Sequence, residues 1–212
     1  MKNYPIYLEY VWLDGYKTAN LRSKIKVILL QKKKVPLIDD LPIWNFDGSS
    51  TEQAPGSNSE CLLNPVRLYK WHKPNHYIVM CEVLNPDGTP HASNTRHQMK
   101  KLHEETKKEK FWFGFEQEYF ITKDFKPLGF PEFGYPRPQG LYYCGVGGNQ
   151  VVSRDLVMEH LDICLQMGIH LTGVNAEVAV GQWEYQCFSR CALKACDDLW
   201  MTRYILHKIS ED

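Results

Sequence analysis

Two carboxylates stand two residues apart in FWFGFEQEYFIT (111–122), a stretch that otherwise has the composition of a buried β-strand. Because side chains two apart on a strand point to the same face of the sheet, Glu116 and Glu118 project together. Two carboxylates held side by side in a partly buried place need a cation or a proton to offset their repulsion. On an exposed face the pair would be ordinary surface charge, and these residues alone leave both interpretations open.

Two further carboxylates stand alone in apolar segments, Glu177 in VNAEVAV and Glu184 in GQWEYQ. Their odd separation would put them on opposite faces of one regular strand. Gly181 between them allows a turn or bulge that could bring both to one face. Carboxylate oxygens are the ligands that Mg²⁺ and Mn²⁺ prefer, and such ions neutralise charge on a phosphoryl group in transfer. The four glutamates together therefore indicate a divalent metal site.

The N-terminal part of the chain has the pattern of β-structure joined by polar loops. Apolar and polar residues alternate over 6–14 and again over 21–30 with a turn signal between them, which predicts an antiparallel hairpin. A further strand is expected over 77–84. The segment 41–60 is rich in Gly, Ser, Asn and Pro and is expected to be a loop, and loops of such length are often functional.

Helices and strands alternate in the rest of the chain. Capping residues mark two of the helix starts, with Ser93 or Asn94 before the first helix and Ser153 before the second. A loop rich in Pro and Gly occupies 126–140, because proline cannot donate to a helix or a central strand. The predicted helices are 92–110, 153–168 and 193–209, and the predicted strands are 111–122 and two within 171–186 that break near Gly181.

The composition limits the class of protein. Lys plus Arg and Asp plus Glu number 25 each in 212 residues, so no excess charge points to nucleic acid or a membrane as a partner. The N-terminus lacks the apolar core of a signal peptide, and no apolar run approaches the roughly 20 residues that span a bilayer. The seven cysteines are scattered, which favours free thiols over a disulfide framework or a zinc site. We therefore expect a soluble, cytoplasmic protein.

Five segments follow one another along the chain, and they are WNFDGSST (44–51), FGFEQEY (113–119), PRPQGLYYCGVG (136–147), NAEV (175–178) and QWEYQ (182–186). In this order and approximate spacing they resemble glutamine synthetase, most closely its eukaryotic-type, class II form. The resemblance covers nearly the whole chain. It implies an α+β fold with a β-grasp N-terminal domain over 1–88. A catalytic domain over 89–212 would follow, with a curved antiparallel sheet and helices, incomplete at its C-terminal side.

The resemblance implies glutamate–ammonia ligase activity, in which ATP converts glutamate to γ-glutamyl phosphate and ammonia displaces the phosphate. It implies that Glu118, Glu177 and Glu184 bind one Mg²⁺ or Mn²⁺. Glu116 would bind a second ion, which holds the ATP phosphates. Asp47, contributed by a neighbouring subunit, would bind ammonium and accept its proton. Such a role suits a carboxylate, because ammonium has no lone pair until it loses a proton.

Further contacts and an assembly follow from the same resemblance. ATP contacts are expected from Glu116, Glu184, Gln186 and Ser189. Ser50 is expected to contact substrate, although its hydroxyl could equally stabilise the turn in which it lies. The active sites would form between subunits of a homo-oligomer, with two five-membered rings stacked as in class II enzymes.

Two features depart from the family pattern. After Gln186 the family carries Gly-Pro beside the nucleotide, whereas this chain has CFSR (187–190), and a bulky phenylalanine there could narrow the ATP pocket. The chain also stops before the family's second half, which supplies a histidine, the phosphate-binding arginines and further metal ligands. Because phosphoryl transfer needs many groups in place at once, we expect this chain alone to be weakly active or inactive.

Two alternatives therefore stay open. The departures favour a degenerate, non-catalytic paralogue that acts as a structural or regulatory partner of complete subunits, whereas the retained carboxylates favour the enzyme. A plain metal-binding module without a nucleotide explains less, because the resemblance extends well beyond the metal ligands.

Overall fold

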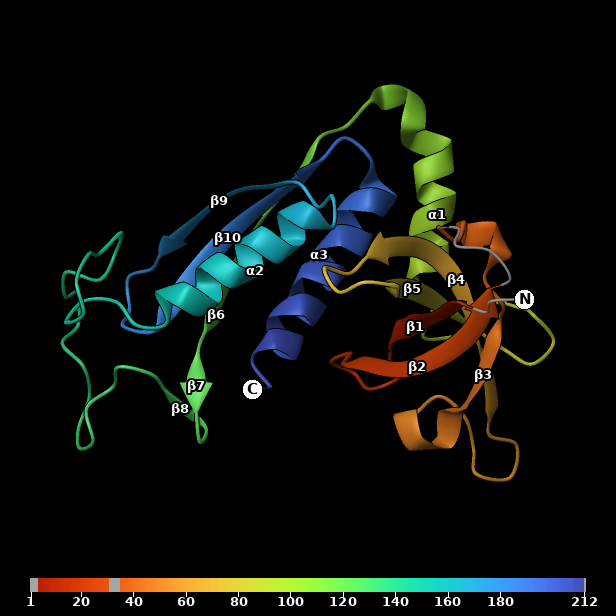
Figure 1. Cartoon of the computed structure of the whole chain (residues 1–212), viewed down its shortest axis with the longest axis horizontal. Coiled ribbons are helices and arrows are strands. Elements are labelled where there is room, and N and C mark those ends of the chain that lie inside the picture. The colour runs from red at the N-terminus through yellow and green to blue at the C-terminus, as the bar shows by residue number, and fades with distance from the viewer. Residues whose placement is uncertain (1–3, 31–34, 212) are drawn as a thin grey trace. The chain divides into compact units, whose positions relative to one another are not determined.

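The computed structural model describes residues 4–30 and 35–211. The chain forms two compact units, Met1–Lys110 and Phe111–Asp212, and each mixes helices and strands as the α+β class requires (Figure 1). The division between the units comes after helix α1 (Thr95–Thr106), whereas the sequence suggested a domain boundary between residues 88 and 89. The extent of the functional domains stays a prediction.

Unit 1 is built on a five-stranded sheet with the strand order β2-β1-β5-β4-β3. Strands β1 and β2 pair antiparallel along their full length, which confirms the predicted hairpin, and β1 also pairs parallel with β5. The strands are β1 (Tyr4–Leu13), β2 (Leu21–Leu30), β3 (Trp44–Asp47), β4 (Glu60–Lys70) and β5 (His76–Leu84), with 3-10 turns at Ile38–Asp40, Gly48–Thr51 and Lys107–Glu109.

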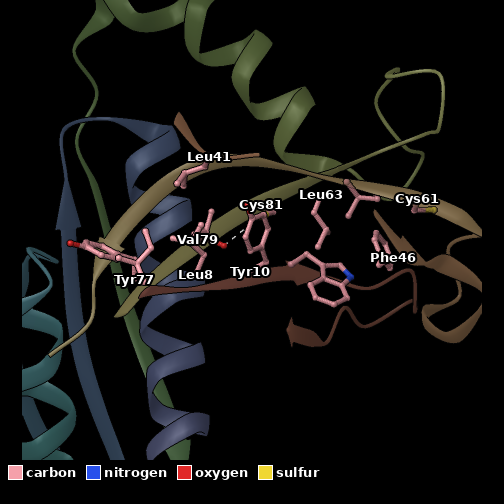
Figure 2. Packing of buried hydrophobic residues seen from close by; sticks show 12 residues of the cluster. Leu8, Tyr10, Leu41, Phe46, Cys61, Leu63, Tyr77, Val79 and Cys81 are labelled. Atoms are coloured by element: carbon pink, nitrogen blue, oxygen red, sulfur yellow. Dashed lines mark hydrogen bonds between the residues drawn. The ribbon is translucent and has the colours of Figure 1, made fainter. Parts of the chain in front are cut away.

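One face of this sheet carries the hydrophobic core of unit 1. Every second residue of β1 from Ile6 to Trp12 is buried, because alternate side chains of a strand share a face. Figure 2 shows Leu8 and Tyr10 of β1 close to Val79 of β5, in one cluster of buried residues. The Tyr10 hydroxyl donates to the carbonyl oxygen of Pro42 at 2.6 Å, which satisfies its polar atom.

The expected loop over 41–60 is only partly irregular, since it contains strand β3 and the turn Gly48–Thr51. The prediction of a continuous loop was wrong because four residues of this segment pair with β4, a strand that the sequence did not indicate. Pro65 lies at a shift of register within β4. A proline is tolerated there because an irregularity leaves a residue without a ladder hydrogen bond.

Unit 2 contains a three-stranded antiparallel sheet with the order β6-β10-β9. Its strands are β6 (Phe113–Phe120), β9 (Leu171–Ala176) and β10 (Gln182–Ser189), and its helices are α2 (Arg154–Gln166) and α3 (Ala192–Ile209). A small hairpin joins β7 (Thr122–Lys123) to β8 (Lys126–Pro127). The predicted helices and the break between two strands near Gly181 are confirmed.

Helices α2 and α3 cover one face of this sheet (Figure 1). That face buries Trp183 and Tyr185 of β10, and the Tyr185 hydroxyl lies 2.8 Å from Thr202 Oγ1 of α3. The predicted cap of α2 was wrong, because Ser153 has a φ of 58° and its side chain makes no capping bond. Asn94 does cap α1 by accepting from the His97 N–H. None of the helices in the described residues is both long and apolar enough to cross a bilayer.

Candidate active site

Three polar side chains form a row across the sheet of unit 2. Glu118 of β6 lies directly opposite Glu184 of β10, which in turn lies opposite Asn175 of β9. Residues opposed in antiparallel strands share a face of the sheet. Because the neighbours Trp183 and Tyr185 face the helices, this row lies on the other face of the sheet.

Glu177 joins the row through the turn that follows β9. Gly181 permits the turn, since its φ is 76° and a Cβ atom there would lie 2.3 Å from the Leu128 carbonyl oxygen. The Glu177 N–H donates to the Gln182 carbonyl at 2.9 Å, which closes the turn. The interruption near Gly181 therefore brings Glu177 and Glu184 together, as the sequence predicted.

One amide group bridges these two glutamates. Asn175 Nδ2 donates to Glu177 Oε1 at 3.1 Å and to Glu184 Oε2 at 3.2 Å. The other oxygen of Glu177 accepts from the Val178 N–H at 2.9 Å. Glu177 and Glu184 are 9% and 8% exposed, so a pair of nearly buried carboxylates shares one donor. Sequence reasoning missed Asn175, although it stands in the NAEV segment.

Hydrogen bonding keeps Glu184 ionised. The hydrogen bond from the Gln186 side chain is the largest effect on Glu184, and it lowers the pKa of this carboxyl. Burial raises the pKa, whereas Asn175 and Glu177 lower it further, and the pKa lies below its ordinary value. An ionised, nearly buried carboxylate favours a cation close by, because its charge is poorly hydrated.

Glu116 and Glu118, the pair in GFEQEY, are both exposed. Glu118 accepts from Gln182 Nε2 at 2.6 Å, and Gln182 Oε1 accepts from the Ala179 N–H at 3.2 Å. This second bond fixes the Gln182 amide with its NH₂ group toward Glu118. Glu118 thus shares the face with Glu184 but is directed to a different donor.

As the side chains lie, no three acidic, histidine or cysteine residues within 4–30 and 35–211 are arranged to hold a metal ion. The donor set nevertheless suits a hard divalent cation. All of its donor atoms are carboxylate oxygens, which such ions prefer. Glu177 and Glu184 already accept hydrogen bonds from the same group, the NH₂ of Asn175. Turning Glu118 from Gln182 would add a third carboxylate from the facing strand.

Asp47 lies in unit 1 and is exposed at the end of β3. It accepts from the Ser49 N–H at 3.0 Å, from the Ser49 hydroxyl at 2.6 Å and from the Ser50 hydroxyl at 2.9 Å. These bonds, that of the Ser49 hydroxyl first, lower the pKa of Asp47 to about 2. The Ser50 hydroxyl is thus engaged within the turn, which is the structural role that the sequence left open.

The residues expected near ATP divide between the two faces of the sheet. Glu116 lies opposite Gln186, on the face of the glutamate row, and Gln186 Nε2 donates to Asn175 Oδ1 at 2.9 Å. Ser189 is buried on the opposite face, where its hydroxyl accepts from the Cys191 N–H at 3.1 Å. The ATP contacts therefore stay a prediction, and any contribution of Ser189 from the carboxylate face would have to come from its backbone.

The departure from the family pattern places an aromatic ring at the end of the carboxylate face. Phe188 lies opposite Gly114. Its ring packs edge-on against Trp112 and His170, with centroids 5.5 and 5.8 Å away. The Arg190 guanidinium lies 4.7 Å from the centre of the Trp112 ring. Phe188 and Arg190 of CFSR (187–190) therefore belong to a cation–aromatic cluster with Trp112 and His170.

Comparison with known proteins decides the family. Residues 92–212, more than half of the chain, match the family described as glutamine synthetase, catalytic domain. The chain belongs to the glutamine synthetase family. The match includes Glu116, Glu118, Glu177 and Glu184, and it begins within the part of the chain that the sequence assigned to the catalytic domain.

Named glutamine synthetases resemble the chain over nearly all its length. The protein from Bradyrhizobium diazoefficiens is 51% identical over 209 residues, which cover 96% of this chain and 58% of that protein. The protein from Saccharomyces cerevisiae is 45% identical and is matched over 55% of its length. The chain therefore spans little more than half the length of the glutamine synthetases that it matches.

Solved structures support the fold. A cryo-EM structure of Plasmodium falciparum glutamine synthetase superimposes with a TM-score of 0.66 at 14% identity, covering 97% of this chain and 45% of that one. A structure described as a GmaS/ADP complex gives a TM-score of 0.70 at 18% identity, covering 96% and 46%. At these identities the likeness concerns the mixed α and β architecture alone.

Proposed function

We propose that this chain forms part of a glutamate–ammonia ligase, which makes glutamine from glutamate, ammonium and ATP through γ-glutamyl phosphate. The observation that carries the proposal is the row of Glu118, Glu184 and Asn175 across one sheet face, with Glu177 bonded to its end. Membership of the glutamine synthetase family and relatives of that name support it.

Glu118, Glu177 and Glu184 are proposed to hold one Mg²⁺ or Mn²⁺ ion, and Glu116 is proposed to help hold a second. Such ions, when bound, neutralise the charge that develops on the phosphoryl group in transfer. The chain's own part is to keep Glu184 ionised and to hold the carboxylates on one face. The low pKa of Glu184 and the shared Asn175 donor support this.

Asp47 is proposed to bind ammonium, and the geometry favours binding over proton transfer. A carboxyl with a pKa of about 2 stays ionised throughout the physiological range and attracts a cation. The same low pKa makes it a weak base, so the hydroxyls of Ser49 and Ser50 reduce its ability to take the ammonium proton. Ser50 then acts through Asp47 and not on the substrate directly.

The remaining features of the proposal come from family resemblance. They are a β-grasp fold for the N-terminal domain, ATP contacts from Glu116, Glu184, Gln186 and Ser189, and a homo-oligomer of two stacked five-membered rings with sites between subunits. The mixed sheet of unit 1, with β1 and β5 parallel at its centre, supports the first of these. A cytoplasmic location remains an expectation.

The direct test joins residues 1–212 to the part of the Bradyrhizobium glutamine synthetase outside the matched region, at the end of the alignment. The hybrid should form γ-glutamyl hydroxamate from glutamate, hydroxylamine and ATP in the presence of Mn²⁺. Glu184→Gln in the same hybrid should abolish the product, and Glu132→Gln, on an exposed loop of unit 2, should not. A folded, assembled hybrid without activity would contradict the proposal.

One observation favours a second function. Phe188 packs against Trp112 and His170 at the end of the carboxylate face, which suits a non-catalytic paralogue that assembles with complete subunits. Replacing CFSR (187–190) in an inactive hybrid by the corresponding residues of the Bradyrhizobium protein separates the two functions. Recovered activity would assign the defect to this cluster and support the paralogue.

A further inference from the structure

Glu177 and Glu184 come from different segments, and a side-chain network holds them in register. Their shared donor is Asn175 Nδ2, at 3.1 and 3.2 Å. The amide NH₂ of Asn175 faces the two glutamates, and its oxygen faces away from them, toward Gln186. The orientation of this amide is therefore set by its hydrogen-bond partners on both sides.

The oxygen of the same amide is also held. Gln186 Nε2 donates to Asn175 Oδ1 at 2.9 Å, from two residues beyond Glu184 on β10. Gln186 is half-buried and its side chain runs across β9, so Asn175 is fixed from both ends of its amide. Neither Asn175 nor Gln186 brings a net charge, so each can affect a cation only through the position and the hydrogen bonding of the carboxylates.

A glycine makes room for this arrangement. Gly173 of β9 lies directly opposite Gln186, and a Cβ atom at that position would lie 2.6 Å from Gln186 Oε1. Any side chain at residue 173 would displace the Gln186 amide from its place over β9. The network thus extends from Gly173 through Gln186 and Asn175 to Glu177 and Glu184.

We infer that Asn175 is a positioning residue that sets the separation and orientation of Glu177 and Glu184 for a divalent cation, with Gln186 and Gly173 holding Asn175 in place. The inference rests on the metal site proposed above. Partners that orient metal ligands typically change metal affinity about 10–100-fold when they are replaced. The amide of Asn175 supplies such an orienting contact to two ligands at once.

The test measures Mn²⁺ binding to the 212-residue chain by the loss of the free-Mn²⁺ EPR signal, with folding checked by circular dichroism. Asn175→Ala should weaken Mn²⁺ binding about 10–100-fold. Gly173→Ala should weaken it in the same direction, although it removes no polar atom. Gly114→Ala is the matched control, because a Cβ atom there meets nothing within 4 Å in the same sheet.

A double variant distinguishes positioning from general loss of structure. If Gly173 acts through Asn175, adding Gly173→Ala to Asn175→Ala should weaken Mn²⁺ binding no further, whereas independent effects would add. If Asn175→Ala does not fold, Asn175→Leu takes its place, because leucine keeps about the size of the side chain and removes both of its polar atoms. A folded Asn175→Leu variant with unchanged Mn²⁺ affinity would overturn the inference.

The outcomes separate the inference from the proposed function. An unaltered chain that binds Mn²⁺, together with a folded Asn175→Ala variant of equal affinity, would overturn the role of Asn175 and leave the metal site standing. An unaltered chain that binds no Mn²⁺ would contradict the metal site itself, and the role of Asn175 with it.

Discussion

Glu118 and Glu184 lie directly opposite one another on the paired strands β6 and β10. Like charges opposed in this way destabilise a strand pair. Glu184 is kept ionised by Gln186 and Asn175, and Glu118 is directed toward Gln182. The metal-free sheet therefore contains a repulsion that a bound cation would convert into an attraction, so metal binding and stability should be coupled.

Removing one charge of this pair should stabilise the metal-free chain. We expect Glu118→Gln to raise the free energy of unfolding by about 0.2–1 kcal/mol in EDTA, because the repulsion across β6 and β10 is lost. With Mn²⁺ present the unaltered chain should become the more stable of the two. Urea denaturation in EDTA and in Mn²⁺ measures both effects, with Glu132→Gln as a control away from the sheet. A loss of stability in EDTA would count against the repulsion.

The turn between β9 and β10 should depend on Gly181. An alanine there would have to adopt a φ of 76° and would place its Cβ atom 2.3 Å from a backbone oxygen. We expect Gly181→Ala to lower the free energy of unfolding by more than about 1 kcal/mol. Gly148→Ala, where a Cβ atom meets nothing within 4 Å, should have a much smaller effect in the same urea titration. Equal effects at both sites would show that the strain at Gly181 is absorbed.

Local patterns predicted the elements whose signals lie in neighbouring residues. The alternation over 6–14 and 21–30 predicted the first hairpin, and Gly181 predicted the break between β9 and β10. The sequence did not predict strand β4, because Pro65 interrupts its pattern. The proline is tolerated at a shift in the pairing of β4 with β5, and this shift can be known only from the structure. The prediction that Ser153 caps α2 failed for a similar reason. The backbone conformation of Ser153 depends on the surrounding chain and cannot be read from the neighbouring residues.

The sequence predicted the charged residues of the candidate site but not the neutral polar residues that bind them. Isolated carboxylates in apolar segments stand out, which is why Glu177 and Glu184 were found. Asn175 and Gln182 are ordinary polar residues whose importance appears only in the register of three strands, where each lies within reach of a carboxylate. The separate donor of Glu118 could not be foreseen either, since it depends on the turn before β10.

The low pKa of Asp47 should depend on its serine neighbours. Ser49→Ala removes the hydroxyl with the largest effect, so the pKa of Asp47 should rise from about 2 toward its ordinary value, while the Ser49 backbone bond and Ser50 keep part of the shift. Carbon-13 NMR of the Asp47 carboxyl group during an acid titration measures this.

Ser57→Ala, an exposed serine farther along the same loop, should leave the titration unchanged. Because the folded pKa lies below the unfolded one, the contribution of Asp47 to stability is complete above the unfolded value of about 3.9 and is lost as the pH falls through about 2. A Ser49→Ala variant with the original pKa would show that the backbone sets it.

His160 of α2 is fully buried, and its Nε2–H donates to the Thr202 carbonyl at 2.9 Å. Its other nitrogen, Nδ1, is buried without a hydrogen-bond partner among the described residues. This arrangement fits a neutral ring, since protonation would create an N–H group with no acceptor. Burial accordingly holds the pKa of His160 below its ordinary value, although the Thr202 bond opposes the shift.

Stability should therefore fall as the pH drops below the unfolded histidine value of about 6.5, because the unfolded chain then binds a proton that folded His160 resists. We expect the free energy of unfolding to decline between pH 7 and 5, by at most about 1.4 kcal/mol per pH unit from this group. His160→Gln, which keeps a donor for Thr202, should be less stable at pH 7 but should lose less on acidification. His207→Gln, exposed on α3, should keep the original slope in urea titrations at both pH values. An unchanged slope in His160→Gln would assign the acid sensitivity to other groups.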